Sequence, residues 1–303
     1  MPRRRRTKPV NVWAVQAEGW ESFYPTSGET FFIDPVNGSD YKRGTDFYHP
    51  LSTLQAAIDR CEDKRGDQVI CARGPYDITT PVLFNKTGIT VKAAEFGGQR
   101  KVIGEYNALL SNAAYTDGPV ALVSAACTID GFGFVSRDVG ATFYDGAALL
   151  LRGSLAGTAD ANPFNVRITN CRFPKWGLDN RIGIGIDGSS DCMIDHCTFE
   201  GVSATFDSGI YVQGATQNIH IHRNVFRQCT YGTVFGSFAG GGPHCIISEN
   251  WYEDSKCLSA SSAATGLVCG NWLEGATDSG SYNGDVDTLN GYGLVFCDQH
   301  YAE

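Results

Sequence analysis

Hydrophobic and polar positions follow a short unit that recurs along this chain. A seven-residue pattern with apolar residues at its second and seventh positions begins at residues 128, 167, 193, 220, 246 and 267. The successive gaps between these copies are 39, 26, 27, 26 and 21 residues. Alternation over so few residues is typical of a β-strand with one buried face. Recurrence at roughly two dozen residues is typical of coils stacked in a solenoid.

A second apolar segment lies between the copies and ends in glycine. The four segments are Leu149–Gly153, Ile184–Gly188, Ile210–Gly214 and Gly232–Gly236. Glycine adopts φ > 0 without steric strain, so each of these glycines can turn the chain. Two or three short strands per repeat, without helices between them, predict an all-β fold: a right-handed, single-stranded parallel β-helix. A β-sandwich would instead show hairpins with Asn-Gly or Asp-Gly turns and no repeat in register.

Stacking the copies in register predicts columns of equivalent residues about 4.8 Å apart. The second and seventh positions would form two core ladders, which are Ile129, Ile168, Ile194, Ile221, Ile247 and Val268, and Phe134, Phe173, Phe199, Phe226, Tyr252 and Leu273. Asn224, Asn250 and Asn271 fall in one column, where each amide can bond to the coils above and below. We therefore interpret these asparagines as structural.

The eleven cysteines would allow five disulfides. Cys127, Cys192 and Cys245, however, alternate with Val and Ile in one column, which predicts small buried residues two coils apart and too distant to bridge. Cys171 and Cys197 fall on adjacent coils and could approach each other. The pattern favours reduced cysteines and folding in a cytoplasm.

Residues 31–104 depart from the repeat and are expected to form a cap with the first coils. Ser52-Thr-Leu-Gln55 matches a capping box, with Ser52 as N-cap and Gln55 three residues later. Apolar residues follow at helical spacing until Gly66, so we expect an amphipathic helix of about three turns over the open end of the first coil. Short strands are expected at residues 69–72, 82–84, 89–91 and 101–103.

The cap also carries a resemblance to a known superfamily. The segments Phe32–Asp40, Gly44-Thr45, Pro50–Asp59, Gly66-Asp67 and Gly74–Tyr76 resemble the opening of pectate-lyase-like β-helix proteins. That superfamily includes polysaccharide lyases and hydrolases, and also bacteriophage virion proteins such as tailspikes. The resemblance implies the same architecture over about residues 31–275, but its specific motifs lie within 31–92 and indicate fold, not chemistry.

We divide the chain into a basic arm (residues 1–30), the cap with the first coils (31–104) and a β-helix body (105–303). Charge separates the arm from the other two parts. The first eight residues hold five of the 24 basic residues and no acid, which leaves 19 basic against 33 acidic residues elsewhere. The basic residues of the arm are Arg3, Arg4, Arg5, Arg6 and Lys8. We expect the arm to anchor the protein to an acidic partner surface, although a solvated, disordered terminus is the alternative. The acidic body would repel nucleic acid, so no specific nucleic-acid partner is expected.

Neither a membrane nor a secretion route is indicated by the hydrophobic pattern. No apolar run is long enough to span a bilayer, and no apolar stretch follows the basic start. We therefore expect no membrane contact and no signal peptide. Hydrophobic residues make up 42% of the chain and charged residues 19%, which indicates a packed core.

The candidate chemistry lies in the copy Met193–Phe199, whose Ile-Asp-His resembles the Trp-Ile-Asp-His segment of pectate lyases. Those lyases also need an Arg-x-Pro-x-x-Arg motif and a cluster of calcium-binding aspartates, and neither appears here. The related glycosidases need Asn-x-Asp, Asp-Asp, Gly-His-Gly and Arg-x-Lys on consecutive coils, and the chain has no such set. The register predicts Asp195 beside His222, an arrangement in which the carboxylate would raise the histidine pKa. Asp187 and Glu249 would supply a second carboxylate for glycoside cleavage. The alternative is an outward polar ladder on a solvated face; no metal site or cofactor is predicted.

Aromatic residues outside the ladders offer a different kind of site. Trp176, Tyr211, Tyr231 and Phe235 could stack on sugar rings along a groove, or pack beneath loops or at a subunit interface.

Three functions follow from these features. The first is a non-enzymatic phage virion protein, a capsid decoration or tail-associated β-helix that is made in the host cytoplasm, forms a homotrimer, contacts capsid or tail proteins through its arm and binds surface glycans. The alternative is a polysaccharide lyase or glycoside hydrolase. A third hypothesis is a lectin-like binder of polysaccharide without chemistry.

Overall fold

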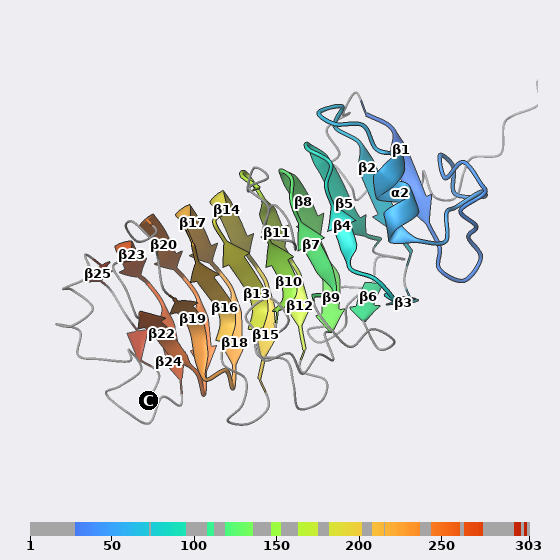
Figure 1. Cartoon of the computed structure of the whole chain (residues 1–303). Helices are drawn as coiled ribbons and strands as arrows, with labels where there is room; N and C mark the ends of the chain where they lie inside the picture. The colour runs from blue at the N-terminus through green and yellow to red at the C-terminus, as the bar shows by residue number, and fades with distance from the viewer. Residues whose placement is uncertain are drawn as a thin grey trace, which may run out of the picture.

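The molecule is a stack of coils built from three parallel β-sheets (Figure 1). The computed structural model describes residues 28–72, 74–94, 108–111, 119–135, 147–152, 163–174, 182–201, 208–214, 216–236, 244–260, 264–274, 294–297 and 300–301. The sheets are named A (ten strands), B (nine strands) and C (seven strands), and from β4 to β24 a strand of sheet C is followed by one of sheet A and then one of sheet B. Every strand pairs in parallel with the equivalent strand one coil away, for example Ile168 with Ile194 and Ile194 with Ile221.

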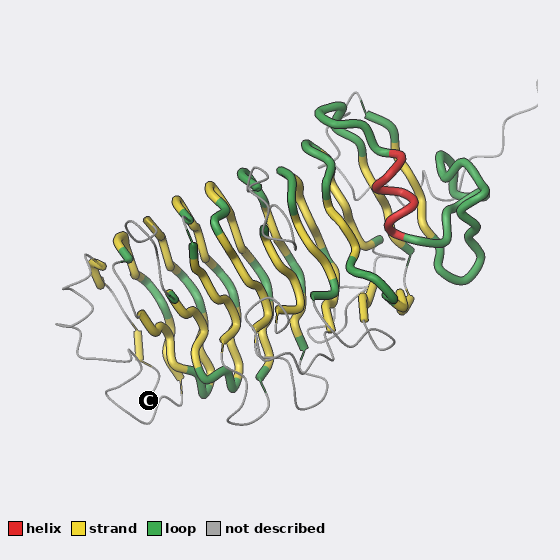
Figure 2. Tube along the Cα trace, in the orientation of Figure 1, coloured by secondary structure: helices red, strands yellow, loops and turns green. Residues whose placement is uncertain are grey.

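The three sheets run the length of the stack (Figure 2). Sheet A contains β1 (Thr30–Ile33), β2 (Gln68–Cys71), β5 (Ile89–Ala93), β8 (Cys127–Asp130), β11 (Arg167–Thr169), β14 (Ser190–Asp195), β17 (Gln217–His222), β20 (His244–Ser248), β23 (Thr265–Cys269) and β25 (Leu294–Cys297). Sheet B contains β3 (Gly74–Asp77), β6 (Ala108–Ser111), β9 (Phe132–Val135), β12 (Arg172–Phe173), β15 (Thr198–Glu200), β18 (Val225–Arg227), β21 (Trp251–Glu253), β24 (Trp272–Glu274) and β26 (His300–Tyr301). Sheet C contains β4 (Val82–Phe84), β7 (Ala121–Val123), β10 (Ala147–Leu151), β13 (Ile182–Asp187), β16 (Ser208–Gln213), β19 (Tyr231–Phe235) and β22 (Lys256–Ala260).

Both predicted core ladders are confirmed. The Ile/Val column of sheet A is completely buried. The rings of Phe173, Phe199, Phe226 and Tyr252 stack at successive centroid distances of 4.8 Å, with planes within 8° of parallel. This distance equals the strand spacing, so identical positions on successive coils bring the rings into face-to-face contact. The second segments are also strands, and Gly188 (φ 74°) and Gly214 (φ 71°) make the predicted left-handed turns after β13 and β16. Gly236 does not adopt the expected positive φ, and Gly153 lies outside the described residues.

The asparagine column is a continuous hydrogen-bonded ladder between sheets A and B. The Asn250 Nδ2 donates to the Ile221 carbonyl (3.0 Å) and to Asn271 Oδ1 (3.0 Å). Asn250 Oδ1 in turn accepts from the backbone N–H of Asn224 (2.9 Å). Because all three asparagines are buried, these bonds satisfy polar groups that water cannot reach. The structural interpretation of the asparagines is therefore confirmed.

Cysteine takes over the asparagine position in the middle of the stack. The Cys197 thiol donates to the Ile168 carbonyl (3.6 Å), the equivalent of the carbonyl that the Asn224 amide reaches from the next coil (2.9 Å). The ten cysteines whose side chains the structure describes are free thiols, including Cys171 and Cys197. Burial raises the pKa of the Cys127 and Cys192 thiols to about 12, so the predicted role as small buried residues holds.

The cap helix is α2 (Leu54–Arg60), and it corrects the predicted capping box. Its N-cap is Thr53, not Ser52, because the Thr53 hydroxyl accepts from the backbone N–H of Ala56 (3.3 Å). With seven residues the helix is also shorter than the predicted three turns. Gln55 does not reach back to the cap: its side-chain oxygen accepts from the backbone N–H of Leu83 in β4 (2.8 Å). The helix thus protects the edge strand of sheet C.

Some predictions fall on residues outside the described ranges, namely the arm before residue 28, the strand at 101–103 and Trp176. The strands predicted at 69–72, 82–84 and 89–91 are confirmed as β2, β4 and β5. Within the described part of the chain, no helix has the length and apolar character needed to cross a membrane.

Candidate functional site on the outer faces of sheets A and B

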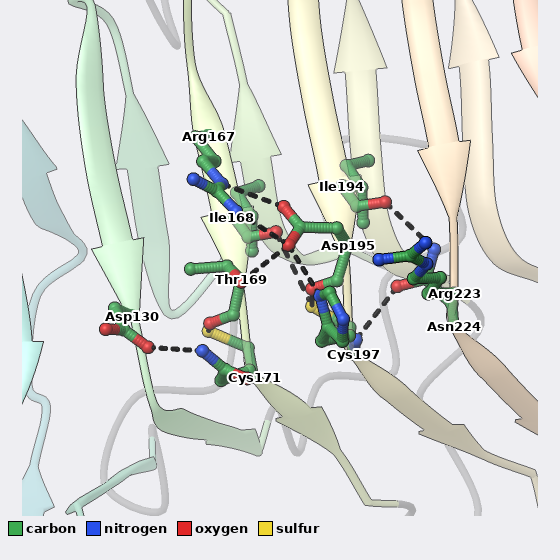
Figure 3. A network of polar contacts seen from close by, with 12 residues as sticks. Asp130, Arg167, Ile168, Thr169, Cys171, Ile194, Asp195, Cys197, Arg223 and Asn224 are labelled. Atoms are coloured by element: carbon green, nitrogen blue, oxygen red, sulfur yellow. Dashed lines mark hydrogen bonds and ion pairs between the residues drawn. The ribbon is translucent and has the colours of Figure 1, made fainter.

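Asp195, the candidate of the alternative enzymatic function, lies at the end of β14 in a dense polar network (Figure 3). Its side chain is completely buried. Arg167, one coil below, donates from Nε and Nη2 to the two carboxylate oxygens at 2.9 Å each. Thr169 Oγ1 donates to Oδ2 (2.9 Å), and His196 Nδ1 lies 2.7 Å from the same oxygen. Asp195 is therefore a buried, fully partnered carboxylate and not part of a solvated ladder.

This network keeps Asp195 ionised. Burial by itself raises the pKa of the Asp195 carboxyl, but the hydrogen bonds from Arg167, His196 and Thr169 outweigh burial and lower the pKa to about 2. A carboxyl group with so low a pKa holds its charge throughout the physiological range. It can orient a neighbouring base, but it cannot serve as the proton donor of a glycosidase.

His196 owes its position to the turn between sheets A and B. Its φ is +55°, and the equivalent residue of every neighbouring described coil is also left-handed; these residues are Gly131, Asn170, Arg223, Glu249 and Gly270. This left-handed residue changes the direction of the chain after each sheet A strand. At His196 it directs the imidazole ring toward the carboxylate of Asp195. The ring remains 46% exposed, which leaves it open to solvent on its far side.

His222 lies one coil above Asp195, as the register predicts. The Asp195 carboxylate, however, hydrogen-bonds to His196 and not to His222. The His196 and His222 rings are 6.2 Å apart at an angle of 70°. Burial lowers the pKa of His222, and the opposing charge of Asp195 does not overcome it. The Asp195 charge does act to raise this pKa, as expected, but burial has the larger effect and the net shift is downward.

The structure does not bring Asp187 and Glu249 to Asp195. Asp187 ends β13 in sheet C and pairs with Arg152 (3.1 Å). Glu249 follows β20, two coils above Asp195, and pairs with Arg223 (2.7 Å), which lowers the Glu249 pKa. Over the described residues, no three His, Cys, Asp or Glu side chains form a group that could hold a metal ion.

These ion pairs belong to a set that all run in the same direction along the stack, which was not among the expectations from the sequence. In six pairs the cation comes from the coil on the N-terminal side and the carboxylate from the next coil, namely Lys92–Asp130, Arg152–Asp187, Arg167–Asp195, Arg172–Glu200, Arg223–Glu249 and Arg227–Glu253. The last four pairs are separated by 28, 28, 26 and 26 residues. Opposite charges at the repeat spacing were the signal that could have revealed them.

The predicted aromatic site does not form as a unit. Phe235 is completely buried in the core, which corrects its assignment to the surface. Tyr211 is half-buried against Leu122, Ala147, Leu150 and Ile182. Tyr231 is half-buried with the Lys256 ammonium 5.4 Å from its ring centre.

An exposed aromatic pair occurs elsewhere, on the outer face of sheet B. Trp251 and Trp272 are in register on β21 and β24, with ring centres 6.0 Å apart and planes within 10° of parallel. They are 39% and 44% exposed. Both occupy the sixth position of the repeat, between an inward Asn and an inward Tyr or Leu. Strand alternation therefore predicts that they point outward, a signal that the repeat itself contained.

The comparisons with known proteins agree with this architecture. The family model described as "Right handed beta helix region" matches residues 107–277, and the chain belongs to this family. The predicted fold class is thereby confirmed. No curated protein matches the sequence.

Solved structures extend the likeness beyond the matched region. Escherichia coli YbhC is 11% identical with a TM-score of 0.55, over 92% of this chain and 86% of that one. The catalytic domain of a GH87 α-1,3-glucanase in complex with nigerose is 12% identical with a TM-score of 0.52, over 92% of this chain and 46% of that one. A rhamnogalacturonan lyase is 15% identical with a TM-score of 0.48, over 82% and 68%. At these identities the likeness concerns the fold alone, which the chain shares with the glucanase domain.

Proposed function

We propose that the protein is a non-enzymatic β-helix structural protein that holds polysaccharide on its outer surface without cleaving it. The observation that carries this proposal is the pairing of Asp187, Asp195 and Glu249 with arginines of the preceding coil. Glycoside cleavage requires a protonated acid and a second carboxylate about 5–10 Å apart. Asp195 and Glu249 both have lowered pKa values, and the three carboxylates lie on different sheets or coils.

Polysaccharide is the proposed partner because two observations favour it. The fold is shared with proteins that act on polysaccharides. The exposed Trp251 and Trp272 rings offer apolar faces, and such faces of aromatic side chains pack well against ring-shaped, partly apolar ligands.

A polysaccharide panel tests this function. The full chain would be incubated with neutral and acidic polysaccharides, and binding would be measured by co-sedimentation with insoluble polymers and by affinity electrophoresis with soluble ones. We expect binding to at least one polymer without new reducing ends or unsaturated products after prolonged incubation. Time-dependent product formation by a homogeneous preparation would overturn the non-enzymatic assignment.

We further propose that the arm of residues 1–30 attaches this body to a phage particle, with the β-helix exposed on a capsid or tail as a homotrimer. The support is the charge division of the sequence, because a basic arm on an acidic body separates an anchoring end from a displayed one. Deletion of residues 1–9 is expected to abolish incorporation into particles. Unchanged occupancy on particles would overturn the anchoring role.

A second candidate is a polysaccharide-cleaving enzyme, and one contact favours it. His196 is half-exposed, and its Nδ1 is fixed by the buried Asp195 carboxylate, so the opposite ring nitrogen could take a proton from a bound sugar. In this case His196→Ala would lower the rate about 10²–10⁴-fold. The matched control is His220→Ala, a histidine of the same sheet without this carboxylate partner, which should retain activity.

A further inference from the structure

We propose that Trp251 and Trp272, with Glu253 and Glu274 beside them, form a subsite for a neutral glycan on the outer face of sheet B. This inference rests on the proposed binding of polysaccharide and goes beyond it by naming the place and the class of sugar. Three observations support it: the fixed backbone of the tryptophans, the charge beside them, and the small extent of the apolar surface.

The buried asparagine ladder holds the two tryptophans in position. Asn250 and Asn271 directly precede them, and their amides bond to the neighbouring coils. The Trp251 N–H donates to the Asn224 carbonyl and the Trp272 N–H to the Asn250 carbonyl, both at 2.8 Å. Since the backbone at both tryptophans and the side chains of the preceding asparagines are hydrogen-bonded to neighbouring coils, little backbone conformational entropy is lost when a ligand contacts the rings.

The charges beside the rings select against acidic sugars. The next outward column of sheet B carries Arg227, Glu253 and Glu274 on successive coils. Arg227 is neutralised by Glu253 (2.8 Å), and Glu274 is exposed, so the column carries an excess of negative charge beside the tryptophans. Carboxylates accept hydrogen bonds from sugar hydroxyl groups but repel uronates and sulfated sugars. The acidic balance of the chain beyond its arm adds to this repulsion.

A sugar fits this surface better than a second protein chain does. Among the side chains that the structure describes here, the exposed apolar area consists of two on adjacent coils, while the column below them contains the partly buried Val225 and the polar Thr198. A stable protein interface buries about 1,200 Å² or more. Two rings that are each about 40% exposed provide far less apolar surface than this, but enough to stack on one or two sugar units.

Isothermal titration calorimetry with the full chain tests the subsite. The probes are neutral hexasaccharides of glucan, galactan and mannan, and an oligogalacturonate of the same length. We expect a neutral hexasaccharide to bind more tightly than the oligogalacturonate. Trp272→Ala and Trp251→Ala should each weaken this binding at least tenfold, the loss typical of a central aromatic contact. Tyr41→Ala, which removes a fully exposed aromatic from the cap, is the matched control and should bind as the wild type does.

The remaining outcomes show whether the subsite alone or the proposed function as well is wrong. If a neutral glycan binds and both tryptophan variants bind it equally well, the subsite is wrong while polysaccharide binding stands. Preference for oligogalacturonate would overturn the charge argument, and Glu274→Gln should raise uronate affinity if that argument holds. No binding to any probe or polymer would overturn both proposals. If sedimentation velocity shows that Trp272→Ala dissociates an oligomer without altering glycan binding, the pair is a subunit contact instead.

Discussion

The cap and the body differ in the groups that their acidic side chains bind. In the cap, Asp34, Asp40 and Asp67 accept hydrogen bonds from backbone N–H groups of neighbouring segments, such as those of Asn37, Ser52 and Glu62. In the body, six carboxylates pair with an arginine or lysine side chain of the preceding coil, as Asp195 does with Arg167.

The difference follows from what each region lacks. The cap is irregular, so its backbone groups have few strand partners and side chains must satisfy them. The body satisfies its backbone through three parallel sheets, so its charges are available to link coils. Because each coil contacts only its neighbours, a change in the body should act locally, whereas a change in the cap should expose the end of the stack.

The largest effect is expected for Asp67→Ala in the cap. Asp67 is completely buried and accepts from the backbone N–H groups of Glu29 and Glu62 and twice from Arg65. Its loss leaves a buried cluster of donors without an acceptor and should reduce the free energy of unfolding by about 3 kcal/mol. Urea unfolding would measure this change. The exposed Asp59→Ala is the control, and equal losses in the two variants would contradict the argument.

The next effect is expected within the asparagine ladder. Asn250→Ala removes the acceptor of the Asn224 N–H and the donor to the Ile221 carbonyl, and should cost about 2–3 kcal/mol. Asn250→Cys should cost less, because a thiol can donate to that carbonyl as the Cys197 thiol does to Ile168. Urea midpoints of the two variants would give the difference. If Asn250→Cys and Asn250→Ala reduce the free energy of unfolding equally, the thiol does not replace the hydrogen bond that the amide donates.

Asp195→Asn should produce a loss that depends on pH. Folding lowers the Asp195 pKa from 3.8 to about 2, so the ionised carboxylate stabilises the native state above pH 3.8 by about 2 kcal/mol. This contribution is lost as the pH falls from about 4 to 2, because the native carboxylate is then protonated. Urea midpoints of wild type and variant should therefore differ at neutral pH and converge near pH 2. A difference independent of pH would contradict the ionised state.

The smallest effect is expected for the exposed pair of Arg223 and Glu249. Both side chains are more than half exposed, so solvent and salt screen their attraction. Arg223→Gln, Glu249→Gln and the double variant form a cycle in which the coupling should be small at low salt and absent at high salt. A coupling free energy that persists at high salt would contradict this prediction, because it would mean that a single exposed cross-coil pair stabilises the fold.

The sequence allowed good prediction where a repeat was involved and poor prediction where it was not. The register that pairs Asp195 with His222 could be counted from the seven-residue pattern, but the partner of the carboxylate could not. His196 bonds to Asp195 because a left-handed turn directs its ring backward, and Arg167 reaches up from the coil below. The N-cap was misassigned because Ser52 and Thr53 are both capping residues. The structure distinguishes them through the Thr53 hydroxyl, which donates to Asp40 Oδ2 and accepts from the backbone N–H of Ala56.

The sequence by itself determined the stacked architecture, the inward ladders of Ile, Phe and Asn, and the outward direction of Trp251 and Trp272. It did so because the period-two alternation of strands and a constant repeat length together decide which positions meet across coils. Only the tertiary structure decided that Asp195 is buried, that its carboxylate bonds to His196 and not to His222, and that Phe235 belongs to the core. These outcomes depend on side-chain conformation and on the packing of neighbouring coils, which residue spacing along the chain does not specify.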